Sequence, residues 1–106
     1  MDVNRKTAYY VLMDVENKKS YSNLALNHHI IISKPTNEAF VRELVYGVLE
    51  NKMLLDYVID HLIPKDVEKM NTRDLTILRM GIYQLAKMNS VPEYAAVNES
   101  VVLAKR

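Results

Sequence analysis

The sequence predicts an all-α fold, a single bundle of five or six helices joined by short loops. Apolar residues recur at helical spacing along most of the chain. The 106 residues include only two Gly and three Pro, and few stretches have the character of strands. With 49% hydrophobic and 25% charged residues, the composition suits a globular domain with one modest core. Residues 1–106 are therefore interpreted as one domain.

The first expected helix lies in "NRKTAYYVLMDVENKK". Four of its apolar residues fall at i, i+3, i+4 and i+7, namely Ala8, Val11, Leu12 and Val15. This spacing places them on one stripe that faces a core, with Arg5 and Lys6 pointing away from it. The segment is predicted to be an amphipathic helix.

The next segment, "SYSNLALNHHIIIS", admits two interpretations. Leu24, His28 and Ile31 have helical spacing, whereas "IIIS" alone has strand propensity, and periodicity cannot decide so short a run. A helix is the preferred interpretation. The following "SKPTN" predicts a turn, and Thr36 or Asn37 is available there as the N-cap of the next helix.

Two further helical stretches are expected between Glu38 and Ile63, joined near "ENKM" and ended by Pro64. Their expected core residues are Phe40, Leu44 and Val48 in the first, and Leu55, Val58, Ile59 and Leu62 in the second. Gly47 lies inside the first stretch. Because Gly in a helix costs about 1 kcal/mol relative to Ala, Gly47, like Gly81, is expected where a neighbouring helix approaches closely.

Asn71 and Thr72 can cap the helix "RDLTILRMGIYQLAKM". Its predicted core stripe consists of Leu75, Leu78, Ile82 and Leu85. After "NSVPEY" a last helix is expected, with Val97 and Val101 on one face. No Gly, Asn or Pro follows to end this helix before Arg106. The chain is therefore expected to be an N-terminal piece of a longer protein.

No catalytic or metal-binding residue is predicted. The sequence has no Cys, which excludes disulfides, zinc thiolate sites and thiol catalysis. His28 and His29 are adjacent, so their rings diverge by about 100° on a helix and one metal cannot easily take both. His61 lies beside Asp60, but no motif places a Ser or Cys nucleophile near it, and a capping or surface role is expected.

Apolar stretches and net charge indicate where the protein is located in the cell and which partners it has. No apolar stretch is long enough to span a bilayer, and the polar N-terminus does not fit a signal peptide, which favours a soluble, cytoplasmic protein without a membrane partner. A net charge of +1 gives no global argument for nucleic acid. Any such role has to rest on local clusters of charge.

One ion pair is expected from the edges of the last two core stripes. Arg79 directly follows Leu78, and Glu99 lies between Val97 and Val101. A pair between Arg79 and Glu99 would tie the last two helices together. Two separate solvated charges are the alternative, and the residues do not decide between them.

Four segments, in this order, resemble the NusB-like domain: "RKTAYYVL", "YSNLALN", "AFVRELVYGVLENKMLLDYVI" and "ILRMGIYQLAKMNSVPEYAAVNESVVLAK". The resemblance is closest to the N-terminal domain of the bacterial ribosomal RNA cytosine-C5 methyltransferases of the RsmB (Sun, Fmu) type. It runs from about Asn4 to the end of the chain. The most specific parts are "LVYGVLENKMLLDYVI" and "ILRMGIYQL" followed by "VPEYAAVNESVVLAK".

The resemblance implies an all-α NusB-type fold and an accessory domain that helps to dock small-subunit ribosomal RNA. The catalytic domain and the S-adenosylmethionine that it uses would lie downstream in the parent chain, so this piece itself is expected to be no enzyme and to hold no cofactor. One alternative is a free-standing NusB-type transcription antitermination factor that binds RNA with a ribosomal protein. A second alternative is a helical adaptor that binds protein through an amphipathic face.

The residues expected to bind RNA are Arg5, Lys6 and Tyr9. Tyr9 follows Arg5 by one helical turn, so a phosphate could meet the cations while a base stacks on the ring. The residues alone favour simple solvation of a helix end, and the resemblance reverses that preference. NusB factors begin with an arginine-rich segment, which is thinned here to two cations. Weak binding is therefore expected, with a log–log salt slope of about −1 to −2.

Overall fold

The computed structural model describes residues 2–63 and 69–88, which form five helices and no strand. The all-α prediction is confirmed. The helices are α1 (Val3–Lys18), α2 (Ser22–Ser33), α3 (Glu38–Glu50), α4 (Lys52–Leu62) and α5 (Thr72–Lys87). The last helix expected from the sequence lies outside the described residues.

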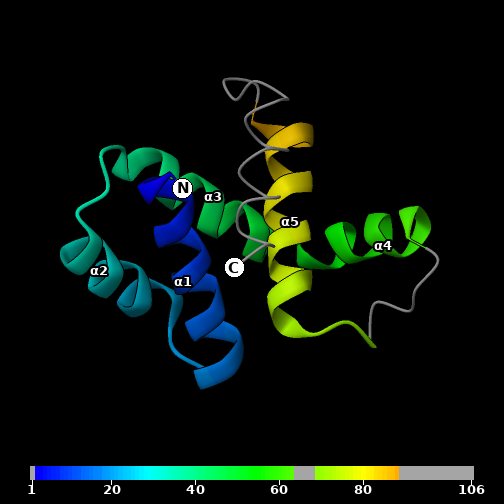
Figure 1. The fold of residues 1–106 in the computed structure, drawn as a ribbon, viewed down its shortest axis with the longest axis horizontal. Coiled ribbons are helices and arrows are strands. Elements are labelled where there is room, and N and C mark those ends of the chain that lie inside the picture. The colour runs from blue at the N-terminus through cyan, green and yellow to red at the C-terminus, as the bar shows by residue number, and fades with distance from the viewer. Residues whose placement is uncertain (1, 64–68, 89–106) are drawn as a thin grey trace.

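The helices pack around α1 and α3 (Figure 1). α1 lies against α2, α3 and α5, and α3 also lies against α5. α4 packs mainly on α5 and extends from it on the side away from α1 and α2 (Figure 1). None of the helices in the described ranges has the length and apolar character needed to cross a membrane.

The helix boundaries follow from local side-chain chemistry. Asp2 caps α1 by accepting from the backbone N–H groups of Asn4 and Arg5. Asn37 caps α3 and Asn71 caps α5, each by accepting from a backbone N–H three residues later. Of the residues that the sequence offered as caps, the structure thus uses Asn37 and not Thr36, and Asn71 and not Thr72. A single residue, between Glu50 and Lys52, separates α3 from α4, as the junction near "ENKM" predicted.

The predicted core face is confirmed for α1 and wrong for α2. In α1, Ala8, Val11 and Leu12 are buried. In α2, Leu24 and Ile31 are exposed, and the buried residues are instead Ala25, Leu26 and Ile30. Because α2 is apolar on several sides, its periodicity allowed more than one inward face, and the packing of α2 against α1 decided between them.

The inward face of α5 also differs from the predicted stripe. Leu85 is exposed, and the other three predicted residues, Leu75, Leu78 and Ile82, are only half-buried. The buried residues are the apolar Ile77, Met80 and Tyr83 together with the polar Thr76, Arg79 and Gln84. Hydropathy pointed to the wrong face because two long polar side chains of this helix, Arg79 and Gln84, are buried in hydrogen bonds with other helices.

Gly47 permits the close packing of α3 on α5. A Cβ built on Gly47 would overlap the Cζ, Oη and Cε2 atoms of the Tyr83 ring. Burial raises the pKa of the Tyr83 hydroxyl above its usual value of 10.0, and the nearby charges of Glu43 and Glu50 raise it further. The expected close approach at this glycine is confirmed.

Candidate nucleic-acid interface

Arg5 does not point into solvent as the sequence predicted. It is 7% exposed. Its Nε donates to Oε1 of Gln84 on α5 at 2.7 Å, its Nη1 donates to Oδ2 of Asp2 at 2.6 Å, and its guanidinium lies 5.0 Å from the centre of the Phe40 ring. A buried guanidinium is retained when its N–H groups find such partners. Arg5 therefore joins α1 to α3 and α5.

Tyr9 is likewise directed inward, because it packs against the core at partial burial. The accessible pair next to it is Lys6 with Tyr10. The Lys6 Nζ lies 5.9 Å from the centre of the Tyr10 ring, and Tyr10 is 41% exposed. The spacing i, i+4 brings such side chains together on a helix, so this pair could have been found in the sequence.

Rings from α2 extend this aromatic surface. Tyr9 and Tyr10 lie 5.5 Å apart, Tyr10 and His29 stack at 6.1 Å and 20°, and His28 meets His29 edge to face at 5.1 Å. These four residues, Tyr9, Tyr10, His29 and His28, are called the ring row below. Within residues 2–63 and 69–88, no three His, Cys, Asp or Glu side chains form a group able to hold a metal ion.

An ionised carboxylate supports the ring row from α1. Asp14 Oδ2 lies 2.6 Å from His29 Nε2, and Asp14 Oδ1 lies 3.4 Å from Lys18 Nζ. Burial acts to raise the pKa of Asp14, but the hydrogen bond and charge of His29 and the charge of Lys18 outweigh it and lower the pKa below 3.8. Because a carboxylate only accepts hydrogen bonds, His29 Nε2–H is the donor.

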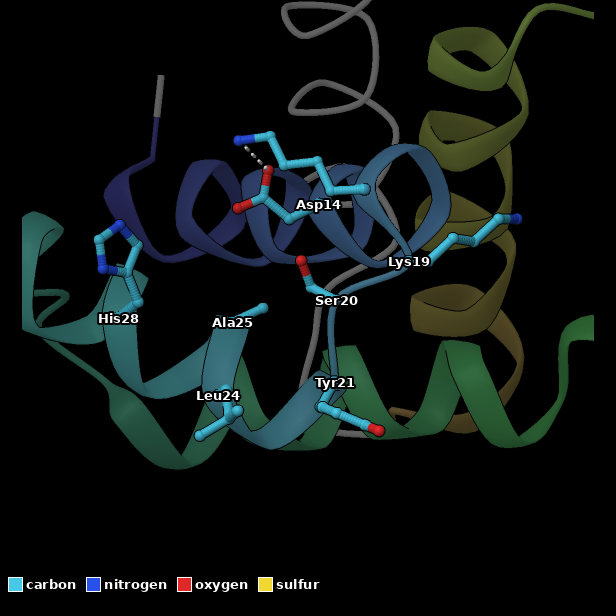
Figure 2. A pocket seen from close by; sticks show the side chains of 8 residues that line it. Asp14, Lys19, Ser20, Tyr21, Leu24, Ala25 and His28 are labelled. Atoms are coloured by element: carbon cyan, nitrogen blue, oxygen red, sulfur yellow. Dashed lines mark ion pairs between the residues drawn. The ribbon is translucent and has the colours of Figure 1, made fainter.

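A pocket of about 390 Å³ opens beside this pair, between α1 and α2 (Figure 2). It is lined by Asp14 and Lys18 from α1, by Lys19, Ser20 and Tyr21 from the connection, and by Leu24, Ala25 and His28 from α2. Its charged residues are one carboxylate, already paired with His29 and Lys18, and two lysines. The sequence interpretation did not find this pocket, because it forms only when the two helices pack.

Arg79 is buried at 6% exposure and joins three helices. Its Nε and Nη2 donate to the two carboxylate oxygens of Asp56 on α4, at 2.6 and 2.8 Å. Its Nη1 lies 3.5 Å from Oε1 of Glu16 on α1, and Lys52 Nζ donates to the same oxygen. The predicted partner Glu99 lies outside the described residues, so that pair stays a prediction, and the sequence did not point to Asp56.

The lowered pKa of Asp14 leads to a testable pH dependence. A carboxyl group with a lower pKa in the folded state contributes stability above its unfolded pKa, and that contribution disappears as the pH falls through the folded pKa. The free energy of unfolding of the native protein should therefore exceed that of Asp14→Asn at about pH 5, and the difference should vanish toward about pH 2. Asp60→Asn on the exposed side of α4 is the control, and urea unfolding followed by circular dichroism is the measurement. An unchanged difference across this range would contradict the assignment.

Comparisons with known proteins agree on one family. The NusB family matches residues 2–106. The chain is 35% identical over 103 residues to the probable ribosomal RNA small subunit methyltransferase B of Bacillus subtilis, covering 95% of this chain and 23% of that protein. It is 31% identical over 103 residues to the transcription antitermination protein NusB of Bacillus velezensis, covering 96% of this chain and 78% of that protein.

A solved structure shows the same fold. A chain in the crystal structure described as that of a plectonemic RNA supercoil matches with a TM-score of 0.86 at 19% identity, covering 97% of this chain and 78% of that chain. This chain thus spans under a quarter of the matched methyltransferase and most of the matched NusB protein.

Proposed function

The chain belongs to the NusB family, and from this premise we propose that it is an RNA-binding protein of the NusB type, acting in transcription antitermination with a ribosomal protein. The observation that carries the proposal is the family match over residues 2–106. The relationship to NusB, which extends over 78% of the Bacillus velezensis protein, supports this role. Such a protein would act in the cytoplasm, where transcription takes place.

The proposed RNA contact centres on Lys6 and Tyr10. The Lys6 ammonium can meet a phosphate, and the exposed Tyr10 ring offers a face on which an unpaired base can stack. Arg5 and Tyr9, which the sequence assigned to RNA, do not contact RNA in this proposal but support the residues that do. Arg5 holds the start of α1 against α5, and Tyr9 supports the Tyr10 ring.

A second function is favoured by the 35% identity with the Bacillus subtilis methyltransferase. In that proposal the chain is the domain that docks small-subunit ribosomal RNA for a separate catalytic domain, and S-adenosylmethionine is bound by the latter. The two glycines of this chain lie inside α3 and α5, so they form no glycine-lined turn of the kind that holds such a cofactor. The domain would contribute RNA docking and no catalytic group.

Both functions are tested by the affinity for labelled single-stranded fragments of ribosomal RNA as the salt concentration is raised. The double variant Lys6→Ala, Tyr10→Ala is expected to bind roughly tenfold more weakly, with a smaller salt slope, because a phosphate contact and a stacking face are lost. Lys69→Ala, an exposed lysine between α4 and α5, is the control. Circular dichroism verifies that each variant is folded.

The outcomes separate the functions. If the native protein binds no fragment at low salt, RNA binding is rejected and the helical adaptor becomes the better explanation. If adding a ribosomal protein strengthens RNA binding, the antitermination role is supported. If the ribosomal proteins have no effect and small-subunit fragments bind best, the docking domain of a methyltransferase is supported instead.

A further inference from the structure

We infer that the pocket between α1 and α2 receives one unpaired nucleotide of a single RNA strand that also contacts Lys6 and Tyr10. The inference rests on the proposed function, because it extends the RNA path beyond the Lys6 and Tyr10 pair. It names the class of ligand as single-stranded RNA and assigns a second contact to residues of the α1–α2 connection.

The ring row connects the two places. His28 lines the pocket and contacts His29, which stacks on Tyr10 at 6.1 Å. With a rise of about 1.5 Å per residue, Lys6 and Lys18 lie about 18 Å apart along α1. A strand of a few nucleotides could therefore follow the rings from Lys6 to the pocket.

The lining suits a nucleotide. Tyr21 stands at the rim with 77% of its surface exposed, and Leu24 beside it is also exposed. Figure 2 shows Ala25 and Ser20 between these two residues and Asp14 on α1. A volume of about 390 Å³ is enough for one small molecule and too small for a duplex. Aromatic faces combined with lysines are the usual means of holding single strands without reading their sequence.

The charge of the lining favours an anion. Asp14 is ionised and held by His29 and Lys18, so its charge is largely balanced. Lys18 is paired with Asp14, so the exposed Lys19 leaves a net positive charge at the rim for a phosphate. A protein partner could instead cover Tyr21 and Leu24, but the two lysines and the continuity with the ring row favour RNA.

The experiment uses a labelled oligouridylate of about ten nucleotides and the variant Tyr21→Ser. Tyr21 precedes α2 as its N-cap and makes no side-chain capping bond there, and Ser is a preferred N-cap, so this change removes the ring while favouring the helix. The oligouridylate is expected to bind about fivefold to tenfold more weakly. Lys19→Asn should reduce the salt slope by about 1, because one phosphate contact is lost. Asn is chosen because it tolerates the positive φ of 54° at this position.

Tyr57→Ser is the matched control, because Tyr57 on α4 is also exposed, at 62%. It should leave the affinity unchanged. Amide chemical shifts of residues 18–25 should move during the oligouridylate titration. A duplex RNA probe should bind native and Tyr21→Ser proteins equally, because a paired base cannot enter the pocket.

The failures are distinguishable. If native protein binds oligouridylate and Tyr21→Ser binds it equally well, with no shifts in residues 18–25, the pocket is not an RNA site while the proposed function stands. That result would favour a protein partner as the molecule that covers Tyr21 and Leu24. If native protein binds neither oligouridylate nor ribosomal RNA fragments, the proposed function fails as well.

Discussion

Arg79→Met is expected to lower the free energy of unfolding by about 3 kcal/mol. The change removes a guanidinium that is 6% exposed and leaves the Asp56 carboxylate without its two short hydrogen bonds. Breaking a buried pair is costly because the remaining charge stays desolvated, and the partial exposure of Asp56 keeps the expected cost at the low end of that range. Urea unfolding followed by circular dichroism measures the difference.

Two further variants test the explanation. Arg42→Met replaces an exposed arginine on α3 and should change stability by less than about 0.5 kcal/mol. The double variant Arg79→Met, Asp56→Leu removes both charges and should be more stable than Arg79→Met alone, because no carboxylate is then left unpaired. Equal destabilisation in the single and double variants would show that lost packing, rather than the ion pair, explains the effect.

The second large effect is expected at Gly47. Replacing Gly by Ala inside a helix ordinarily stabilises it by about 1 kcal/mol. Gly47→Ala is nevertheless expected to destabilise the protein by about 2 kcal/mol, because the new methyl group would overlap the buried Tyr83 ring and force α3 and α5 apart. Thermal unfolding should show a correspondingly lower midpoint.

A compensating change identifies the cause. Tyr83→Leu removes the ring atoms that the new methyl group would meet. In the Gly47→Ala background, Tyr83→Leu should cost much less stability than in the native background. Purely additive costs would refute steric overlap as the reason for the glycine.

Much of the local structure could be predicted from residue types alone. The helical period of α1, the caps at Asn37 and Asn71 and the short junction between α3 and α4 depend on neighbours a few residues away. A close approach at Gly47 was also predictable, because Gly destabilises a helix and is retained inside one where a side chain would collide with a neighbouring helix. The identity of the approaching residue, Tyr83, was not predictable.

The candidate site was predicted only in part. The cluster at the start of α1 was identified, yet Arg5 and Tyr9 turned inward, and the accessible pair is Lys6 with Tyr10. Arg5 is buried because Gln84, 79 residues later, accepts its hydrogen bond. Arg5 and Gln84 lie too far apart in the sequence for a local pattern to include both. Arg5 was therefore assigned to solvent because it is charged.

The sequence by itself determined the all-α class, the helical period of α1, the junction between α3 and α4 and the resemblance to the NusB family, because these depend on local propensity and on the order of motifs. Only the tertiary structure decided which faces of α2 and α5 turn inward and which polar groups are buried. The pocket between α1 and α2 and the stacking of His29 on Tyr10 also exist only after packing. The physical reason is that a polar side chain is buried when a distant partner satisfies its hydrogen bonds, and hydropathy along one helix carries no information about that partner.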